Sequence, residues 1–421
     1  MRILVLDGNQ NSAVACVRSL VRAGHCVWVG ASSSLPKAGL SRGCKGSFRY
    51  PGREQGMEAF AKCIAAQVRR VGGTLVLTMT DRNTLALSAH RDLISSAGAR
   101  LALPAHAIVL RAFDKLQVTR LAESLGIAVP QTNWVEQGAQ AEQLADSLHY
   151  PVVLKPSRSE ELSSTGRIRK TGSPLYARNR HEFLRAHVRL SRRCASFLVQ
   201  EFVHGTGAGY SALMREGELR AEFAHRRIRE VRPTGSGSAV RVSIPPTPEL
   251  RSAALSILEA LKWHGVAMVE FRIRPDGTPV LLEINGRFWG SLALAVYSGM
   301  DFPTLLARMV SDGDVTAPSA YRTGICSRWL VGDFRHLLYV LRGAPSGFPE
   351  NYPSRLSTLA RFFVPQSGTF HDNFTWRDPL PELGDWLDFL VRQLPSALRK
   401  TRIDDAALVE QLNAQGRYSR S

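Results

Sequence analysis

Short apolar runs alternate with amphipathic stretches at the start of the chain. Residues 2–7 (RILVLD) and 26–30 (CVWVG) have the pattern of buried strands, and 12–24 has helical spacing between them. A further apolar run at 74–79 leads into a polar segment, where we expect Asp81 to be the N-cap of the next helix or, alternatively, to line a crevice. This βαβ order predicts an α/β fold with a Rossmann-like N-terminal domain. No GxGxxG motif is present, which argues against dinucleotide binding.

Beyond about residue 110, helical and strand patterns follow one another. The spacing of apolar residues predicts helices over 112–126 and 248–264. Apolar runs predict a strand over 150–156 and strands at both ends of 196–214, where a Gly-rich turn interrupts the run. Residues 221–243 are expected to form a strand followed by a loop rich in arginine and glycine.

Residues 266–291 (VAMVEFRIRPDGTPVLLEINGRFWGS) have the pattern of a β-hairpin. Asp276-Gly277 is a strong signal for a two-residue type I′ turn, which needs positive φ at both positions. Folding at this turn pairs residues whose numbers sum to 553, which are Glu270 with Glu283 and Met268 with Asn285. The alternation of side chains in strands then assigns the opposite, buried face to Val269, Phe271, Ile273, Val280, Leu282 and Ile284.

Two carboxylates directly opposite each other on one face of a ladder repel each other. A cation bound between Glu270 and Glu283 explains this arrangement, and Asn285 adds a third oxygen on the same face. Oxygen ligands of this kind suit Mg²⁺ or Mn²⁺. The alternative is an exposed hairpin face whose acidic residues are balanced by Arg272 and Arg274.

Composition is that of a globular protein with an excess of positive charge. The 421 residues have room for two or three domains, and the apolar content of 44% and charged content of 21% are ordinary. The formal net charge of +18 favours association with anions such as nucleotides, acidic substrates, nucleic acid or membrane surfaces. Because the basic residues are spread along the chain, a solvated arginine-rich surface is the plainer explanation.

The location expected from the sequence is cytoplasmic. The six cysteines show no CxxC spacing, so neither a zinc site nor a disulfide framework is indicated. The first apolar run is too short for a signal peptide, and no stretch approaches the length of a membrane span. We therefore expect reduced thiols in a cytoplasmic protein.

The segment EINGRFWGS, preceded by an acidic residue on the paired strand, resembles the metal-binding end of the ATP-grasp superfamily. Its members are mostly ATP-dependent carboxylate–amine or carboxylate–thiol ligases, and the resemblance extends to its carbamoyl-phosphate-synthase and biotin-carboxylase-like group. It implies that Glu270, Glu283 and Asn285 hold Mg²⁺ (or Mn²⁺). It also implies that Arg287 contacts the reacting phosphoryl or acyl group.

Earlier motifs are similar to the same family, in the same order. The resemblance implies that Lys115, at the start of a helix, and Lys155, in VVLKP, contact the phosphates of ATP. Glu201 and Val203, in QEFV, would hold the adenine through a carboxylate and a backbone group. Arg227 is implied as a second catalytic residue on the acceptor side. Considered without this resemblance, the two lysines are ordinary solvated side chains and the QEFV segment belongs to an ordinary hairpin. Arg227 is then part of a solvated run of arginines.

Two segments depart from the family pattern. Residues 157–172 occupy the place of a Gly/Ser loop that closes over the phosphates, but they contain Glu160 and Glu161 and few glycines. Ala208 stands near the place of an acidic residue that binds ribose in relatives. The phosphate contacts of the loop and the ribose contacts are therefore left open.

The resemblance implies three regions: a Rossmann-like domain at 1–110, a two-lobed α+β ATP-grasp domain with lobes at about 111–195 and 196–310, and a C-terminal extension at 311–421 of unknown role. It implies an ATP- and Mg-dependent ligase that joins a carboxylate to an amine through an acyl phosphate and releases ADP and phosphate. The alternatives are a phosphotransferase or thiol ligase of the same fold, and a basic polyanion-binding protein with a non-catalytic nucleotide fold.

The expected partners are small-molecule carboxylate and amine substrates. Binding to nucleic acid is not expected, and a homodimer is compatible with this interpretation. Residues 329–342 have one apolar helical face, which we expect to pack on the rest of the protein. The alternative is weak peripheral contact with a membrane. Residues 371–381 (HDNFTWRDPLP) are expected either to border a substrate channel or to form a packed loop.

Overall fold

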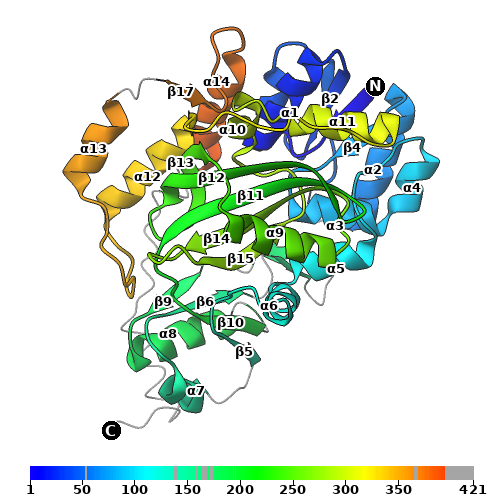
Figure 1. Ribbon diagram of the computed structural model, residues 1–421. Helices are drawn as coiled ribbons and strands as arrows, with labels where there is room; N and C mark the ends of the chain where they lie inside the picture. Colours follow the sequence, from blue (N-terminus) through cyan, green and yellow to red (C-terminus); the bar gives the residue numbers. More distant parts are fainter. Residues whose placement is uncertain are drawn as a thin grey trace.

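The computed structural model describes residues 1–52, 55–136, 141–156, 160–162, 168–170, 174–192, 194, 196–364 and 368–393. The chain builds three main sheets, which have four, four and seven strands, and one short two-stranded sheet. The seven-stranded sheet occupies the centre of the molecule, with the N-terminal region on one side and a small lobe below it in the view of Figure 1.

The N-terminal sheet is parallel and has the strand order β3-β2-β1-β4. Its strands are β1 (Arg2–Val5), β2 (Cys26–Ala31), β3 (Gly46–Arg49) and β4 (Leu75–Leu77). Its helices are α1 (Asn11–Arg22), α2 (Gly56–Val71), α3 (Asp81–Ala89), α4 (Arg91–Ser96) and α5 (His106–Phe113), and a 3-10 turn, η1 (Lys37–Leu40), follows β2.

The predicted N-cap Asp81 is wrong. Thr80 caps α3 by accepting from Asn83 N at 3.4 Å, which leaves the Asp81 side chain available for another contact.

The small lobe contains an antiparallel sheet with the order β5-β10-β6-β9. Its strands are β5 (Thr132–Glu136), β6 (Val152–Pro156), β9 (Leu175–Ala177) and β10 (Ser196–Glu201). Helices α7 (Ala141–Ser147) and α8 (Arg180–Ser191) cover one face of this sheet, and β7 (Glu160–Leu162) pairs with β8 (Ile168–Lys170). Helix α6 (Lys115–Ser124) leads into the lobe, and Asp114 caps it by accepting from the backbone amides of Leu116 and Gln117.

The central sheet has the order β15-β14-β11-β12-β13-β16-β17. Its strands are β11 (Thr206–Arg215), β12 (Glu218–Arg232), β13 (Ser236–Ile244), β14 (Gly265–Ile273), β15 (Pro279–Asn285), β16 (Cys326–Arg328) and β17 (Thr369–His371). Helix α9 (Pro248–Ala260) packs on it. The loop predicted within 221–243 is wrong, because two strands, β12 and β13, extend through this region and pair with each other. Arginines at alternate positions fit one face of a paired strand as well as they fit a solvated loop, so their frequency did not distinguish the two.

The predicted pairing of Glu270 with Glu283 is confirmed, but the predicted turn is wrong. Of the two central residues, only Gly277 has a positive φ, of 90°, whereas a type I′ turn needs positive φ at Asp276 as well. Instead, Arg274 accepts from Gly277 N and donates to the carbonyl of Thr278. The longer turn shifts the adjoining pairs by one residue.

A β-bulge at Leu282 restores the register before the acidic pair is reached. The bulge also changes which residues enter the core. Leu281, not Leu282, packs with Phe271 in the core, and Val280 pairs with Arg272 instead of lying on the Phe271 face. The assignments of Val280 and Leu282 to the same face as Phe271 are therefore wrong, because the bulge breaks the strict two-residue alternation.

The residues after β15 pack against both the central sheet and the N-terminal region. They form α10 (Leu292–Tyr297), α11 (Phe302–Asp312), α12 (Leu330–Arg342), α13 (Arg355–Phe363), α14 (Leu380–Asp388) and a π-helical turn, η3 (Phe389–Gln393). Val331, Leu337 and Val340 of α12 are buried, in agreement with the packing interpretation of this helix. In the described part of the chain, no helix combines the length and apolarity needed to span a membrane.

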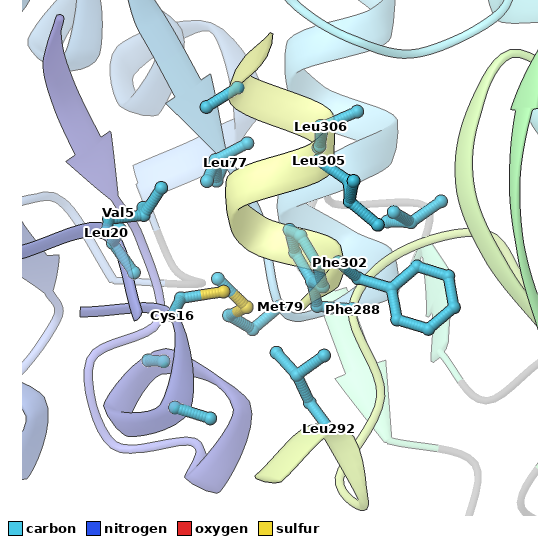
Figure 2. Packing of buried hydrophobic residues seen from close by; sticks show 14 of the residues in the cluster. Val5, Cys16, Leu20, Leu77, Met79, Phe288, Leu292, Phe302, Leu305 and Leu306 are labelled. Carbon is cyan, nitrogen blue, oxygen red and sulfur yellow. The ribbon is translucent and has the colours of Figure 1, made fainter. Parts of the chain in front are cut away.

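One hydrophobic core joins the N-terminal sheet to α10 and α11. Figure 2 shows Val5 and Leu77, from two parallel strands, in the same cluster as Phe302 and Leu305 of α11. Phe288, which follows the hairpin, belongs to the same cluster. Because this core is shared, the position of β15 is fixed relative to the N-terminal sheet.

Buried and largely buried ion pairs attach the C-terminal segment of the described chain to the N-terminal region and to the central sheet. They are Arg18–Asp378, Lys37–Asp385 and Arg241–Asp372. The side chains of Lys37 and Asp385 are only 3% and 5% exposed, and their Nζ and Oδ1 atoms lie 2.7 Å apart. The segment 371–381 is therefore a packed loop over much of its length, since Asp372 and Asn373 are buried, although Trp376 is 90% exposed.

Candidate functional site

The β14–β15 hairpin brings three predicted metal ligands together. Glu270 lies opposite Glu283, and Asn285 Nδ2 donates to Glu270 Oε1 at 3.3 Å. The Glu283 side chain is 38% exposed and that of Glu270 is 16% exposed. Gly286 follows Asn285 where the ring of Trp263 approaches so closely that a Cβ would lie 2.3 Å from it. The glycine therefore lets the Trp263 ring pack directly against the backbone between Asn285 and Arg287.

Two lysines from other elements reach toward the acidic pair. Lys115, the first residue of α6, places its Nζ 3.6 Å from Glu283 Oε2. Lys155 lies near the end of β6 in the small lobe. Burial, together with the neighbouring Lys115 ammonium group, lowers the pKa of Lys155 to about 8, against the opposing effect of Glu283. The site thus lies between the small lobe and the central sheet.

The two carboxylates are in different electrostatic environments. Burial raises the pKa of Glu270; the Arg227 guanidinium opposes this rise and the Glu283 carboxylate adds to it. Burial alone would raise the pKa of Glu283, but the ammonium groups of Lys115 and Lys155 hold it below its usual range. Opposed pKa directions across a carboxylate pair are expected where two like charges share one site.

Arg227 lies on β12 and contacts two acidic side chains. Its Nη2 is 2.7 Å from Glu270 Oε2, and its Nη1 is 3.1 Å from Glu230 Oε1. The guanidinium is almost fully buried, with 10% of the side chain exposed. Glu230 was not predicted as a site residue, because a sequence of alternating arginines and glutamates does not reveal which pairs meet across a sheet.

Arg287 connects the hairpin to the N-terminal region. Its Nη2 donates to Asn285 Oδ1 at 2.8 Å, and its Nε donates to Asp81 Oδ1 at 2.7 Å. Asp81 is therefore a partner of the predicted anion contact and not a helix cap. The polar end of the 74–79 strand was the sequence signal that pointed toward this contact.

The donor set fits a hard divalent cation. Glu270, Glu283 and the Asn285 amide supply oxygen atoms on one face of the hairpin, and this is the ligand type that Mg²⁺ takes together with water and phosphate. No cluster of three or more His, Cys, Asp or Glu side chains suited to a metal occurs in the described ranges. A cation here would therefore depend on the two glutamates, the amide and a ligand such as a nucleotide.

The predicted adenine contacts lie at the segment that joins β10 to β11. Val203 is buried there, and the Glu201 carboxylate is engaged by Arg274, with Oε1 and Nη2 2.5 Å apart. Ala208 is also buried, so the position of the family's ribose-binding acid has no acidic side chain in this chain. Contacts of Glu201 and Val203 with adenine stay predictions.

A segment between α12 and α13 packs against this same region. Phe348 joins Val153 and Phe202 in a small core, and its ring centroid lies 5.3 Å from that of Tyr176. His204 Nδ1 and Glu350 Oε1 are 3.0 Å apart. The chain after β16 therefore supports the β10–β11 connection, which the sequence did not indicate.

Most of the predicted phosphate-covering loop lies outside the described residues. Of residues 157–172, the structure describes only β7 and β8, which pair antiparallel. The expected contacts of this loop with phosphate are therefore predictions that the described residues do not address.

Open space borders Glu283 and Arg287. A hollow of about 20 Å³ is bordered by Lys115, Glu283 and Asn285. A cleft of about 300 Å³ lies on the N-terminal side and is lined by Asp81, Arg287 and neighbouring polar residues. Small molecules can therefore reach the hairpin from the N-terminal sheet.

Comparisons with known proteins agree with this arrangement. The model of a family described as ATP-grasp in the biosynthetic pathway with Ter operon matches residues 193–332, which include the hairpin. The N-terminal section of the carbamoyl phosphate synthase large chain of Methanopyrus kandleri is 27% identical over 198 residues, which are 44% of this chain and 33% of that protein. The D-alanine–D-alanine ligase of Nitrosospira multiformis is 25% identical over 187 residues, which are 41% of this chain and 56% of that protein.

The chain thus spans a third and just over half of the length of these two relatives. Among solved structures, the biotin carboxylase domain of 2-oxoglutarate carboxylase from Hydrogenobacter thermophilus, in complex with MgADP, ADP and bicarbonate, has a TM-score of 0.59 at 16% identity. This likeness covers 77% of the present chain and 73% of the other, and it concerns the fold. The family match over residues 193–332, the two partial relatives and the likeness of fold all indicate the ATP-grasp superfamily.

Proposed function

We propose that this protein is an ATP- and Mg²⁺-dependent ligase that joins a carboxylate to an amine through an acyl phosphate. One observation carries the proposal: Glu270 and Glu283 oppose each other on the hairpin while Lys115 and Lys155 approach the pair. A purely structural ladder gains nothing from opposed carboxylates. A site that binds a metal–nucleotide complex needs both signs of charge at close range.

The nucleotide would lie between the small lobe and the central sheet. In this proposal Lys115 and Lys155 contact its phosphates as point charges, and Glu201 and Val203 contact the base. Glu201 must exchange its contact with Arg274 for the adenine amino group. The domain division at about residues 110 and 310, with lobes meeting near 195, forms part of this proposal.

Glu270, Glu283 and Asn285 would hold Mg²⁺, and Mn²⁺ is a chemically similar alternative. The ion would supply positive charge to the phosphoryl oxygens. Arg227 and Arg287 lie on either side of the acidic pair, through Glu270 and Asn285 respectively. Their charges are placed to stabilise the phosphoryl group as negative charge develops on it.

The reaction has two steps. A carboxylate oxygen of the first substrate attacks the γ-phosphorus of ATP, the bond from this phosphorus to the β–γ bridging oxygen breaks, and ADP leaves. The amine nitrogen of the second substrate then attacks the carbonyl carbon, the bond to the phosphate oxygen breaks, and inorganic phosphate leaves as the amine loses a proton. The chain positions the reactants and stabilises charge, since no general base stands out among the described residues.

Interception of the acyl phosphate tests the proposal. The protein is incubated with ATP, Mg²⁺, hydroxylamine and a panel of amino acids and sugar acids. Formation of a hydroxamate together with ADP and phosphate is the expected result. AMP and pyrophosphate would instead indicate an adenylate, and a phosphorylated product resistant to hydroxylamine would indicate a phosphotransferase.

The carboxylate–amine reaction, small-molecule substrates and a cytoplasmic location are parts of one hypothesis. A thiol in place of the amine would give a thioester, which analysis of the product separates from an amide. A basic polyanion-binding protein of the same fold would release no phosphate with any member of the panel.

A further inference from the structure

A second cleft, of about 270 Å³, opens beside Arg227, the residue that contacts Glu270. It lies between the start of β11, the strand β12 and the helices α12 and α13. Arg227, Arg229, Arg272 and Arg361 all line it, whereas Glu230 is the one acidic residue of its wall among the described residues. The composition of the wall therefore favours an anionic occupant.

The first two arginines are already paired with acidic groups. Arg227 contacts Glu230 and Glu270, as described above. Arg229 Nε lies 2.8 Å from Asp333 Oδ1, but Asp333 is shared with a further cation, because Arg328 Nε lies 2.7 Å from Asp333 Oδ2. One carboxylate thus serves two guanidinium groups.

The other two arginines are not neutralised by a carboxylate. Arg272 Nη1 donates to the carbonyl of Gly205 at 2.7 Å, which leaves its charge uncompensated. Arg361 is exposed on α13 and forms no ion pair within the described ranges. The charge of Arg361 also acts on its neighbour, since burial lowers the pKa of Arg229, Asp333 opposes this, and Arg328 and Arg361 lower it further. With Arg328, which lies behind the wall, five guanidinium groups share three carboxylates. These carboxylates are Glu230, Glu270 and Asp333.

The guanidinium of Arg227 lies between the cleft and the proposed phosphoryl-transfer site. Arg227 lines the cleft and also contacts Glu270. A molecule in the cleft can therefore reach the γ-phosphate region with one end while its other end meets Arg361. The far wall comes from Thr358 and Arg361 of α13 and His336 of α12, which lie outside the part of the chain that the family model matches.

We propose that this cleft binds the carboxylate substrate and that this substrate carries a second anionic group, held by Arg229 and Arg361. The proposal rests on the ligase function above and deepens it by naming a class of substrate, a compact di- or tri-anion. The volume lies just below the ~300 Å³ at which pockets for drug-sized ligands begin, so the substrate is small. Residues after β16 thereby acquire a role in specificity.

Direct binding of a probe anion tests this. Protein saturated with MgADP is titrated calorimetrically with tricarballylate, a small tricarboxylate, and with acetate, at low ionic strength, where screening is weak. Tricarballylate should bind and acetate should not. Arg361→Gln should weaken tricarballylate binding by about tenfold or more, because a charge-assisted contact is lost.

A matched control and a second variant sharpen the result. Arg355→Gln removes the same charge from an exposed position on the same helix, outside the cleft, and should leave binding unchanged. Ser357→Asp adds a negative charge to the exposed rim of the cleft and should weaken binding as Arg361→Gln does. Equal affinity in wild type, Arg361→Gln and Ser357→Asp overturns the proposal, as does displacement of ADP by tricarballylate, which would assign the anion to the nucleotide site.

Failure of this inference is distinct from failure of the ligase proposal. If tricarballylate binding does not depend on the cleft residues, hydroxamate formation is still expected. Conversely, absence of any acyl phosphate, combined with tricarballylate binding that depends on Arg361, refutes the ligase and keeps the anion cleft.

Discussion

Arg287 Nε donates a 2.7 Å hydrogen bond to Asp81 Oδ1, although 206 positions separate the two residues in the chain. Asp81 begins α3 at the edge of the parallel sheet, and Arg287 follows the β14–β15 hairpin. The contact orients the guanidinium toward Asn285. In the proposed mechanism, Asp81 is thus a positioning residue that acts through Arg287.

Replacing Asp81 by Asn should slow turnover more than it weakens nucleotide binding. The guanidinium loses its charged partner, and a misplaced catalytic charge costs between about tenfold and 100-fold in rate. Mg-dependent ATP turnover and the Kd for ADP are measured on the same preparation. Asp92→Asn, at an exposed position of α4, is the control and should change neither quantity. A variant that lost ADP affinity in proportion to rate would contradict the positioning role.

Glu283→Gln should reduce Mg-dependent ATP turnover by about 100-fold or more, because it removes the charge of a proposed metal ligand while keeping the side-chain volume. The fold should persist, since relief of the repulsion with Glu270 favours the metal-free protein. Turnover is measured over a range of Mg²⁺ concentrations, together with the melting temperature. Glu259→Gln, exposed on α9, serves as the matched control. Unchanged turnover at matched Mg²⁺ would remove Glu283 from the metal site.

Nucleotide affinity should fall as the pH rises above about 8. Burial and the neighbouring Lys115 lower the pKa of Lys155 to about 8, so its ammonium group is lost in this range, whereas a bound phosphate stabilises the charged form. Binding of ADP near pH 8.5 should therefore take up a proton. Calorimetry in two buffers of different ionisation enthalpy measures this uptake. Lys155→Arg, which stays charged, should abolish it, and the same pH dependence in that variant would rule out Lys155 as the titrating group.

Glu382→Gln should stabilise the protein at pH 8 and have little effect near pH 4.5. Burial, together with the neighbouring Asp385 carboxylate, raises the pKa of Glu382 to about 7, and Lys37 opposes this rise. Between pH 4.5 and about 7 the folded state holds a proton that the unfolded state has lost, so stability falls as the pH rises. Above pH 7 the penalty is complete, and its upper limit is about 3 kcal/mol. Melting temperatures at the two pH values measure the difference, with Glu123→Gln, exposed on α6, as the control.

The site could be predicted from the sequence where its residues are close together in the chain. The hairpin pattern correctly predicted that Glu270 pairs with Glu283. The turn and the bulge each shift the register by one residue, in opposite directions, so the two shifts cancel at this pair. Alternation in a strand is a local property, but the position of a bulge depends on packing between sheets. The sequence therefore gave the acidic pair and misplaced Leu282.

Contacts between distant segments could not be read in the same way. The pairing of Arg227 with Glu270 depends on the order of the strands in the central sheet. The cover that Phe348 provides for Phe202 depends on how the segment after β16 packs on the rest of the protein. Resemblance to a family supplied Arg227 as a candidate but not its partner. The residues after β16 carry no motif of that family, so their contribution to the anion cleft became apparent only from the fold.

The buried pairs Arg18–Asp378 and Lys37–Asp385 have a consequence for the order of synthesis. A ribosome completes the first parallel strands more than 300 residues before the partners of Arg18 and Lys37 emerge, given separations of 360 and 348 positions. Until then these cations stay hydrated, because burying them without their carboxylates is costly. The N-terminal sheet therefore reaches its final packing only after residue 385 has been synthesised, and a nascent chain stalled before residue 372 would present an unfinished surface to chaperones and proteases.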